Sequence, residues 1–293
     1  MILNLSNKEE VQAKTNEEIQ IMRIGGLIWQ AIKEYLLKEV KVGMSLKEIE
    51  KLVEIQFEKY GVQPAFKETG KFPYLICTSL NNCVVHGSPT KEVIKEGDKL
   101  TIDLGFKYKE FNIDSAFSLF FHPSSDSEEN KELEKKIKEY KYLDQLTKAS
   151  FYEAINELKA ELTTGFITEK IETFFKTYFP SKYSLLENFT GHGIGKKLHD
   201  YPRIQNFGLT KEQGVKLPAG ATICIEPMII EQENGKWEIG KDGYGVCAKN
   251  KNALTIHYEH LVLIQNNGVE ILTASQWELE EMRSSWEIIK KFS

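Results

Sequence analysis

The hydrophobic positions near the start of the chain follow the spacing of amphipathic helices. In residues 15–40, Thr15 and Glu18 have the spacing of a capping box, and apolar side chains then recur about one helical turn apart. A second segment of this kind begins near Ser45, which is followed by Glu48. Its predicted core-facing residues are Ile49, Leu52, Ile55 and Phe57. The chain is therefore predicted to begin with two helices.

The pattern then changes to the alternation of strands. β-Branched and apolar residues alternate with polar ones in "KFPYLICTSLNNCVVHGSP" and "KLTIDLGFKYKEFNIDSAFSLFF", and later in "GATICIEPMII" and "TIHYEHLVLI". Between these groups the charged segment 124–141 is predicted to be a solvated loop that runs into a helix. The order of predicted elements is thus helices, strands, helices, strands.

A faint internal repeat agrees with this order. A shift of about 122 residues places residues 43–57 on 165–179 and matches Gly43 with Gly165 and Ile49 with Ile171. Two amphipathic helices can also match by chance. Taken with the order of elements, the repeat favours two α+β halves related by a pseudo-twofold axis and sharing one sheet.

Composition narrows the class of protein. The chain has 293 residues, of which 41% are hydrophobic, enough for one large domain or two modest ones. The net charge of −5 gives no electrostatic case for nucleic acid or membrane as a main partner. The apolar run at the N-terminus is too short for a signal peptide, and we expect a cytoplasmic protein. The four cysteines form no C-x-x-C pair, so neither a zinc knuckle nor a disulfide framework is indicated.

Two aspartates on neighbouring predicted strands give the first indication of the chemistry of the protein. If the hairpin turns at Tyr108 and Lys109, Asp103 lies directly opposite Asp114. Like charges in that position need a bridging divalent metal or a shared proton. Alternatively, a turn that differs by one residue would expose one aspartate on the other face of the sheet.

Two glutamates on later strands favour a metal. Glu226 ends "ATICIE", and Glu259 lies among apolar residues in "LTIHYEHLVLI". Such buried acids are costly unless they are paired or bind a metal, and no lysine or arginine is close in sequence. Four carboxylates balance two divalent cations. His257 shares the face of Glu259 and is an ambiguous neighbour of the site, whereas His260 is expected to pack on the opposite face.

The loop "FTGHGIGKKLHDYP" supplies two further histidines, His192 and His199, among glycines. Its glycines are not followed by the Lys-Ser/Thr of a P-loop, which disfavours a phosphate cradle. A neutral imidazole would complete a site of mostly oxygen ligands suited to Mn, Fe, Co or Zn.

At this point the sequence resembles the type I methionine aminopeptidases of the pita-bread fold. The resemblance rests on "SLNNCVVHGSP", "TIDLGF", "FNIDSAFSLFF", "TGHGIGKKLHDYP", "CIEPMII" and "HYEHLVLI", which occur in the family's order over about residues 22–272. It implies two fused α+β halves around a curved antiparallel sheet. It also implies five metal ligands, namely Asp103, Asp114, His192, Glu226 and Glu259.

The activity that the resemblance implies is removal of the N-terminal methionine from newly made proteins when the next residue is small. A water or hydroxide bridging two divalent metal ions (Co, Mn, Fe or Zn) would attack the peptide bond. Glu226 would shuttle the proton, His199 would donate to the carbonyl oxygen, and His86 would contact the substrate. The residues that the resemblance places near the methionine pocket are Phe66, Phe72, Cys77 and Trp237.

The same resemblance sets expectations for the whole chain. Residues 1–293 would form a single metallopeptidase domain with a core of about 15–272 and an extra C-terminal helix at about 276–292. The partners would be nascent polypeptide N-termini, with transient ribosome association, and the protein would be a monomer. Leu198, Ser115 and the segment 239–257 depart from the family pattern and put side-chain preference in doubt.

Two other functions remain open. X-Pro aminopeptidases and dipeptidases share the fold and the ligand set, but normally carry an N-terminal domain, and here about twenty residues precede the first core helix. A non-catalytic pita-bread binding module is disfavoured because all five ligands and both substrate histidines are present.

Overall fold

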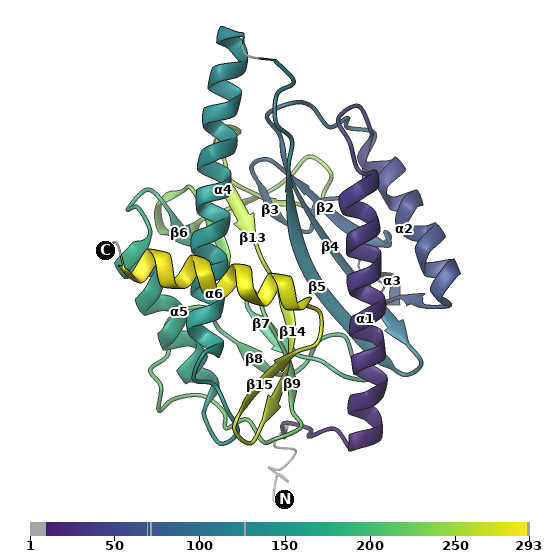
Figure 1. Cartoon of the computed structure of the whole chain (residues 1–293), viewed down its shortest axis with the longest axis vertical. Coiled ribbons are helices and arrows are strands. Elements are labelled where there is room, and N and C mark those ends of the chain that lie inside the picture. Colours follow the sequence, from purple (N-terminus) through teal and green to yellow (C-terminus); the bar gives the residue numbers. More distant parts are fainter. Residues whose placement is uncertain (1–9, 69, 71, 126, 292–293) are drawn as a thin grey trace, which may run out of the picture.

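The computed structural model describes residues 10–68, 70, 72–125 and 127–291. Its helices are α1 (Asn16–Glu39), α2 (Leu46–Tyr60), α3 (Ala65–Glu68), α4 (Glu128–Ile155), α5 (Thr164–Tyr178), α6 (Gln276–Lys291) and the 3-10 turn η1 (Glu233–Gly235). Its strands are β1 (Gln63–Pro64), β2 (Ile76–Leu80), β3 (Cys83–Val85), β4 (Lys99–Tyr108), β5 (Phe111–Phe120), β6 (Ser184–Leu185), β7 (Gly191–Gly193), β8 (Asp200–Ile204), β9 (Thr222–Ile225), β10 (Met228–Ile230), β11 (Glu238–Ile239), β12 (Val246–Cys247), β13 (Thr255–His257), β14 (His260–Gln265) and β15 (Gly268–Ile271). Strands lie in the centre, with α1 and α2 at one side and α4 and α5 at the other (Figure 1).

The two N-terminal helices begin where the sequence predicts. Thr15 and Ser45 are the N-caps of α1 and α2, and each forms a complete capping box with the glutamate three residues later. One predicted core position of α2 is wrong, because the Ile55 side chain is 54% exposed whereas Val53 is buried. With Ile49 facing inward, the 3.6-residue period turns position 53 toward the core and position 55 away from it.

The two-half architecture is confirmed, although the residue pairing of the repeat is wrong. Helices α2 and α5 each have 15 residues and follow a longer helix, and strands follow each pair. However, Gly43 precedes the N-cap of α2, whereas Gly165 lies inside α5. When the two halves are aligned by their helix N-caps, the residue pairs therefore differ by about one helical turn from the pairs that the sequence repeat suggests.

Each half contributes an antiparallel sheet. In the N-terminal half β4 pairs with β1, β2 and β5, and the Trp29 indole of α1 donates a hydrogen bond of 3.1 Å to the backbone carbonyl of Leu104. In the C-terminal half the strand order is β15-β14-β9-β7-β8. An antiparallel bridge between Ala116 and Glu259 joins the two sheets, so backbone from both halves meets beside an acidic side chain.

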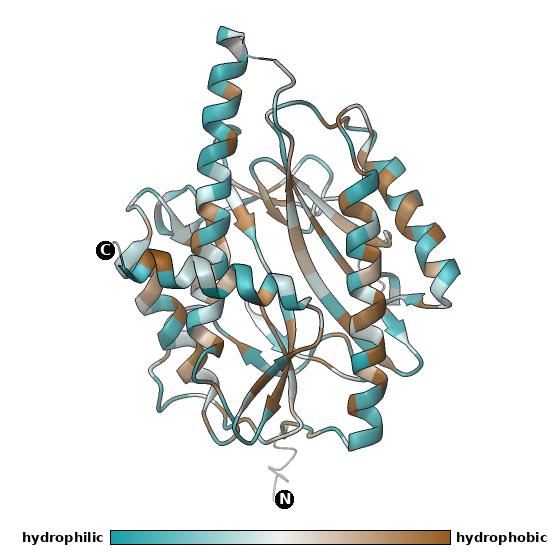
Figure 2. Ribbon diagram, in the orientation of Figure 1, coloured by the Kyte–Doolittle hydropathy of each residue, from teal (hydrophilic) through white to brown (hydrophobic). Residues whose placement is uncertain are grey.

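Two large hydrophobic clusters, one mainly in each half, support this framework. In Figure 2 the helices carry both brown and teal residues along their length, as amphipathic helices that cover a core do. Helix α6 crosses α4 on the outside of the C-terminal half (Figure 1). Among the described residues, no helix combines the length and the apolar character needed to cross a membrane.

Candidate metal centre and active site

A cavity of about 1160 Å³ is lined by residues of both halves. Its titratable lining includes the side chains of Asp103, Asp114, Glu226, Glu259, His86, His192 and His199. The four carboxylates of Asp103, Asp114, Glu226 and Glu259 are called the acid cluster below. All four are buried, so the structure brings together in one place the acids that the sequence singled out.

The two aspartates share a face, but the predicted register is wrong. Asp103 lies opposite Ala116, and Asp114 lies opposite Gly105, because the hairpin turns at Lys109 and Glu110 rather than one residue earlier. A shift of two positions keeps both side chains on the same face of the sheet. A Cβ atom on Gly105 would lie 3.0 Å from the Asp114 Oδ1 atom, so the glycine leaves room for that carboxylate.

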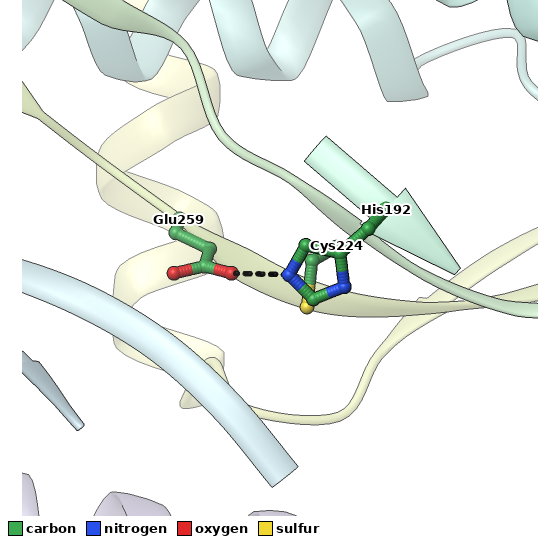
Figure 3. A group of neighbouring side chains, drawn as sticks. All are labelled: His192, Cys224 and Glu259. Atoms are coloured by element: carbon green, nitrogen blue, oxygen red, sulfur yellow. Dashed lines mark ion pairs between the residues drawn. The ribbon is translucent and has the colours of Figure 1, made fainter. Parts of the chain in front are cut away.

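His192 lies at the centre of β7, opposite Cys224 of β9, and faces Glu259 (Figure 3). Its Nε2 atom is 3.6 Å from Glu226 Oε1 and 4.0 Å from Glu259 Oε1. Its Nδ1–H donates to the Gly193 carbonyl at 2.9 Å, which leaves the Nε2 lone pair pointing at the carboxylates. Burial lowers the pKa of His192 to about 3, so the ring is neutral at pH 7.

His257 also belongs to the site, which the sequence left as an ambiguity. It is 1% exposed, and its Nε2 atom is 3.4 Å from Glu226 Oε2 and 3.9 Å from Glu259 Oε2. The sequence indication for His257 was the alternation of side-chain faces along the extended segment that contains Glu259. Burial lowers the pKa of His257 to about 4 even though Asp103 opposes the shift.

Among the residues that the structure describes, no lysine or arginine pairs with the acid cluster. Among the described residues, the ion-pair distances of its carboxylates are all to the imidazoles of His192 and His257. Burial, followed by the charge of the neighbouring carboxylates, raises the pKa of Asp114, Glu226 and Glu259 well above the usual range. Burial raises the pKa of Asp103 to about 6.

These residues fit divalent cations. The Oδ1 atoms of Asp103 and Asp114 and the Oε1 atom of Glu259 are buried without a hydrogen-bond partner. Donor atoms of Asp103, Asp114 and Glu259 lie within 4.8 Å of one another, as do those of Glu226, His257 and Glu259. Unpartnered carboxylate oxygens beside neutral imidazoles are the donor set that Mn, Fe, Co and Zn accept.

The two histidines expected on the substrate side both line the cavity. The His199 ring lies 4.5 Å from the His192 ring at 80°, so it is next to the acid cluster. His86 adopts a φ of 60° and packs edge-on against Phe189 at 5.5 Å. A non-glycine residue in this left-handed region marks a strained position that the surrounding structure enforces.

The apolar wall of the cavity includes three of the four predicted pocket residues. Phe66, Phe72 and Cys77 line it, whereas Trp237 is not among its described lining residues and packs instead against Phe189, with ring centroids 5.3 Å apart. Tyr244, which sequence reasoning missed, lines the cavity and packs edge-on against Phe72 at 5.3 Å. It lies in the atypical segment 239–257, which thus contributes to the wall.

Comparison with known proteins identifies a metallopeptidase family. Residues 20–266 match the model of metallopeptidase family M24. The methionine aminopeptidase of Mycoplasma capricolum is 31% identical over 266 residues, covering 91% of this chain and 99% of that protein. Methionine aminopeptidase 1 of Bacillus subtilis is 31% identical over 89% of this chain and 98% of that protein.

Solved structures give the same result. A crystal structure of the methionine aminopeptidase of Thermotoga maritima has a TM-score of 0.77 at 31% identity and covers 91% of this chain and 100% of that one. A prolidase of Pyrococcus furiosus shares the fold, with a TM-score of 0.65 at 23% identity, and this chain spans 66% of it. With the family match extending over most of the chain and both halves of the fold shared, this chain belongs to metallopeptidase family M24.

Proposed function

We propose that this chain is a metal-dependent aminopeptidase that removes the N-terminal methionine of newly made proteins when the next residue is small. The observation that carries the proposal is the acid cluster, which lines a cavity with an apolar wall and has no lysine or arginine partner in the described part of the chain. The similarity to methionine aminopeptidases along nearly their whole length supports this substrate.

Asp103, Asp114, His192, Glu226 and Glu259 would hold the cations. Four carboxylates carry about −4, which two divalent ions balance. When bound, such ions make water nucleophilic at neutral pH and polarise a substrate carbonyl. The donor set is compatible with Co, Mn, Fe or Zn.

Three further roles in the reaction would be carried out by side chains of this chain. Glu226, whose pKa burial raises, would accept the proton of the attacking water and pass it to the leaving amine. His199 would donate a hydrogen bond to the carbonyl oxygen as negative charge develops there. His86, at the edge of the cavity, would contact the substrate next to the scissile bond.

The methionine side chain would lie against the apolar part of the cavity. Phe66, Phe72, Cys77 and Tyr244 offer apolar and aromatic surface there, and Leu198 adds a flexible aliphatic side chain. Trp237 would act through Phe189, against which it packs. We place the reaction in the cytoplasm, with nascent N-termini as substrates and a single chain as the active unit.

Peptide hydrolysis by the purified protein tests the proposal. The protein loaded with Co(II) or Mn(II) should release methionine from Met-Gly peptides, and chelation should abolish the activity until metal is restored. Leu-Gly peptides serve as the side-chain control. Cleavage of X-Pro peptides in place of Met-Gly peptides would identify the other peptidase activity of this fold, and no hydrolysis with metal bound would overturn the proposal.

Two substitutions separate the assigned roles. Glu226→Gln should lower kcat by about 10²–10⁴-fold through loss of the proton carrier. His199→Ala should keep the wild-type metal content and lower kcat by about 10²–10³-fold. His122→Ala is the matched control, because His122 is exposed and pairs with Glu134 at 3.0 Å. Loss of metal from His199→Ala would show that His199 is a ligand and not a substrate donor.

A further inference from the structure

His257 is the described histidine whose two ring nitrogens are both buried without a hydrogen-bond partner. It projects from β13 beside the acid cluster, and its side chain is 2% exposed. Burying a neutral imidazole with neither nitrogen satisfied is costly. Two unpartnered ring nitrogens beside a cluster of carboxylates therefore point to a partner that comes from outside the chain.

The position of His257 mirrors that of His192 across the two glutamates. Glu226 Oε1 faces His192 Nε2 at 3.6 Å, and Glu226 Oε2 faces His257 Nε2 at 3.4 Å. Glu259 repeats the arrangement, with Oε1 at 4.0 Å from His192 and Oε2 at 3.9 Å from His257. Each glutamate thus lies between two imidazoles, one beside each of its oxygens.

These separations suit donor atoms that share an ion. Nitrogen and oxygen ligands about 2.0–2.2 Å from one cation lie about 3.0–3.5 Å apart at tetrahedral or octahedral angles. The separation of 3.4 Å between His257 Nε2 and Glu226 Oε2 is in that range, and no hydrogen bond joins the two groups. Donor atoms of His257, Glu226 and Glu259 all lie within 4.8 Å of one another.

We propose that His257 is a second nitrogen donor of the metal centre and binds a divalent cation on the side of Glu226 and Glu259 that faces away from His192. The proposal rests on the proposed metal centre and extends its ligand set from one imidazole to two. Each of the two cations would then have its own imidazole, with the glutamates between them.

A second imidazole changes which metals the site prefers. Imidazole is a ligand typical of Zn, Cu, Fe and Ni, whereas carboxylate and water suit Mg and Mn. We therefore expect His257 to strengthen the binding of Co(II) and Zn(II) more than that of Mn(II). His257→Gln keeps a polar side chain of similar length but removes the aromatic nitrogen donor.

The test uses the metal-free full-length chain and measures binding, not hydrolysis. Co(II) is titrated by calorimetry, and the visible absorption of the bound ion is recorded. His257→Gln should weaken the binding of one Co(II) by at least about 10–100-fold and change its spectrum. The fold increase in Kd should be smaller for Mn(II) than for Co(II). His122→Gln, the same change at an exposed histidine, should match the wild type.

A measurement on the wild-type chain covers the case in which His257→Gln fails to fold. Ring ¹⁵N NMR with Zn(II) should show two of the six histidines acquiring metal-bound nitrogens rather than one. Wild-type Co(II) affinity and spectrum in His257→Gln, or a single shifted histidine, would overturn the proposal. Methionine release by a wild-type enzyme that gives this result would leave the proposed function intact, so the two failures are distinguishable.

Discussion

Glu259 and His260 are neighbours in the chain, yet they belong to two buried polar clusters of opposite construction. Glu259 is part of the acid cluster, which has no lysine or arginine partner among the described residues. His260 belongs to what we call the paired cluster, formed by Lys33, Asp144, Lys148, His260 and Glu278. Successive residues on an extended backbone point to opposite faces, which is how one segment serves both clusters.

The paired cluster satisfies its charges internally. Lys33 pairs with Glu278, and Lys148 lies 2.9 Å from Asp144. Although burial alone would raise the pKa of Glu278, Lys33 and His260 bring it below the ordinary value. The His260 ring nitrogens have partners as well, with Tyr258 Oη at 2.7 Å and Thr273 Oγ1 at 2.9 Å.

The acid cluster differs in each of these respects. The pKa of its carboxylates is raised, three of its oxygens lack partners, and both nitrogens of the adjacent His257 are unbonded. The comparison shows that this fold can bury charged groups with their counterions supplied by the chain. Where the chain does not supply them, as in the acid cluster, the counterion is expected to be an external cation.

The largest expected effect comes from breaking the paired cluster. Lys33→Met keeps much of the side-chain volume between Trp29 and Phe117 but leaves the buried Glu278 without its cation. We expect a loss of about 3–5 kcal/mol in the free energy of unfolding, measured by urea denaturation. Metal content should not change.

Arg23→Met is the matched control for that change. Arg23 and Glu270 also form an ion pair, at 2.6 Å, but their side chains are 34% and 33% exposed. Solvent screening limits such a pair to about 1 kcal/mol or less. Equal effects of Arg23→Met and Lys33→Met would contradict the idea that burial makes the paired cluster important for stability.

The same kind of change in the acid cluster should have the opposite sign. In metal-free protein, Asp114→Asn replaces a carboxyl group whose ionisation is opposed by burial and by the neighbouring acids, so we expect the free energy of unfolding at pH 7 to rise, by roughly 1–2 kcal/mol. With saturating metal the sign should reverse, because a ligand is lost and the wild type gains more from binding. Thermal unfolding with and without Co(II) measures both effects.

The pH dependence of the metal-free protein provides a check. The pKa of Asp103 is about 6 in the folded chain and about 3.8 without the fold, so its burial costs stability above pH 6 and the cost disappears as pH falls toward 4. The raised pKa of Asp114 acts in the same direction. The advantage of Asp114→Asn should therefore shrink between pH 7 and pH 5. An advantage that is constant with pH would contradict charge repulsion as its cause.

The sequence predicts the acid cluster better than the paired cluster, for a physical reason. Asp103 and Asp114 stand out because they lie within apolar strands, and Glu226 and Glu259 because they lie among apolar residues beside strand ends; a buried acid in either place requires an explanation. Lys33 and Glu278 lie on amphipathic helices 245 residues apart, where charged residues are common, so no local pattern indicates that they meet.

Register and side-chain contacts are less accessible to sequence reasoning. The hairpin of Asp103 and Asp114 was placed one residue away from its true turn, and the error did no harm because a shift of two positions preserves the face. For His257, alternation predicts the face, but the approach to Glu226 depends on the pairing of β13 with β10, the strand that follows Glu226. That approach is a tertiary contact that no sequence period encodes.

Ser115 lies between the two clusters and gives the smallest and most discriminating test. Its hydroxyl donates to the backbone carbonyl of Glu259 and lies 3.2 Å from His260 Nδ1, while Asp114 precedes it in the chain.

Ser115→Ala should lower the free energy of unfolding by about 1 kcal/mol, the usual net contribution of one hydrogen bond. Because the hydroxyl contacts backbone and His260 rather than a carboxylate, the loss should be equal with and without metal, and the Co(II) affinity should stay unchanged. Ser118→Ala is the control, because Ser118 lies on β5 like Ser115 but its hydroxyl bonds at 2.8 Å to Thr101 of β4, remote from both clusters. A fall in metal affinity for Ser115→Ala alone would mean that the backbone of Glu259 is held in place for the metal, and that the two clusters are mechanically linked through this strand.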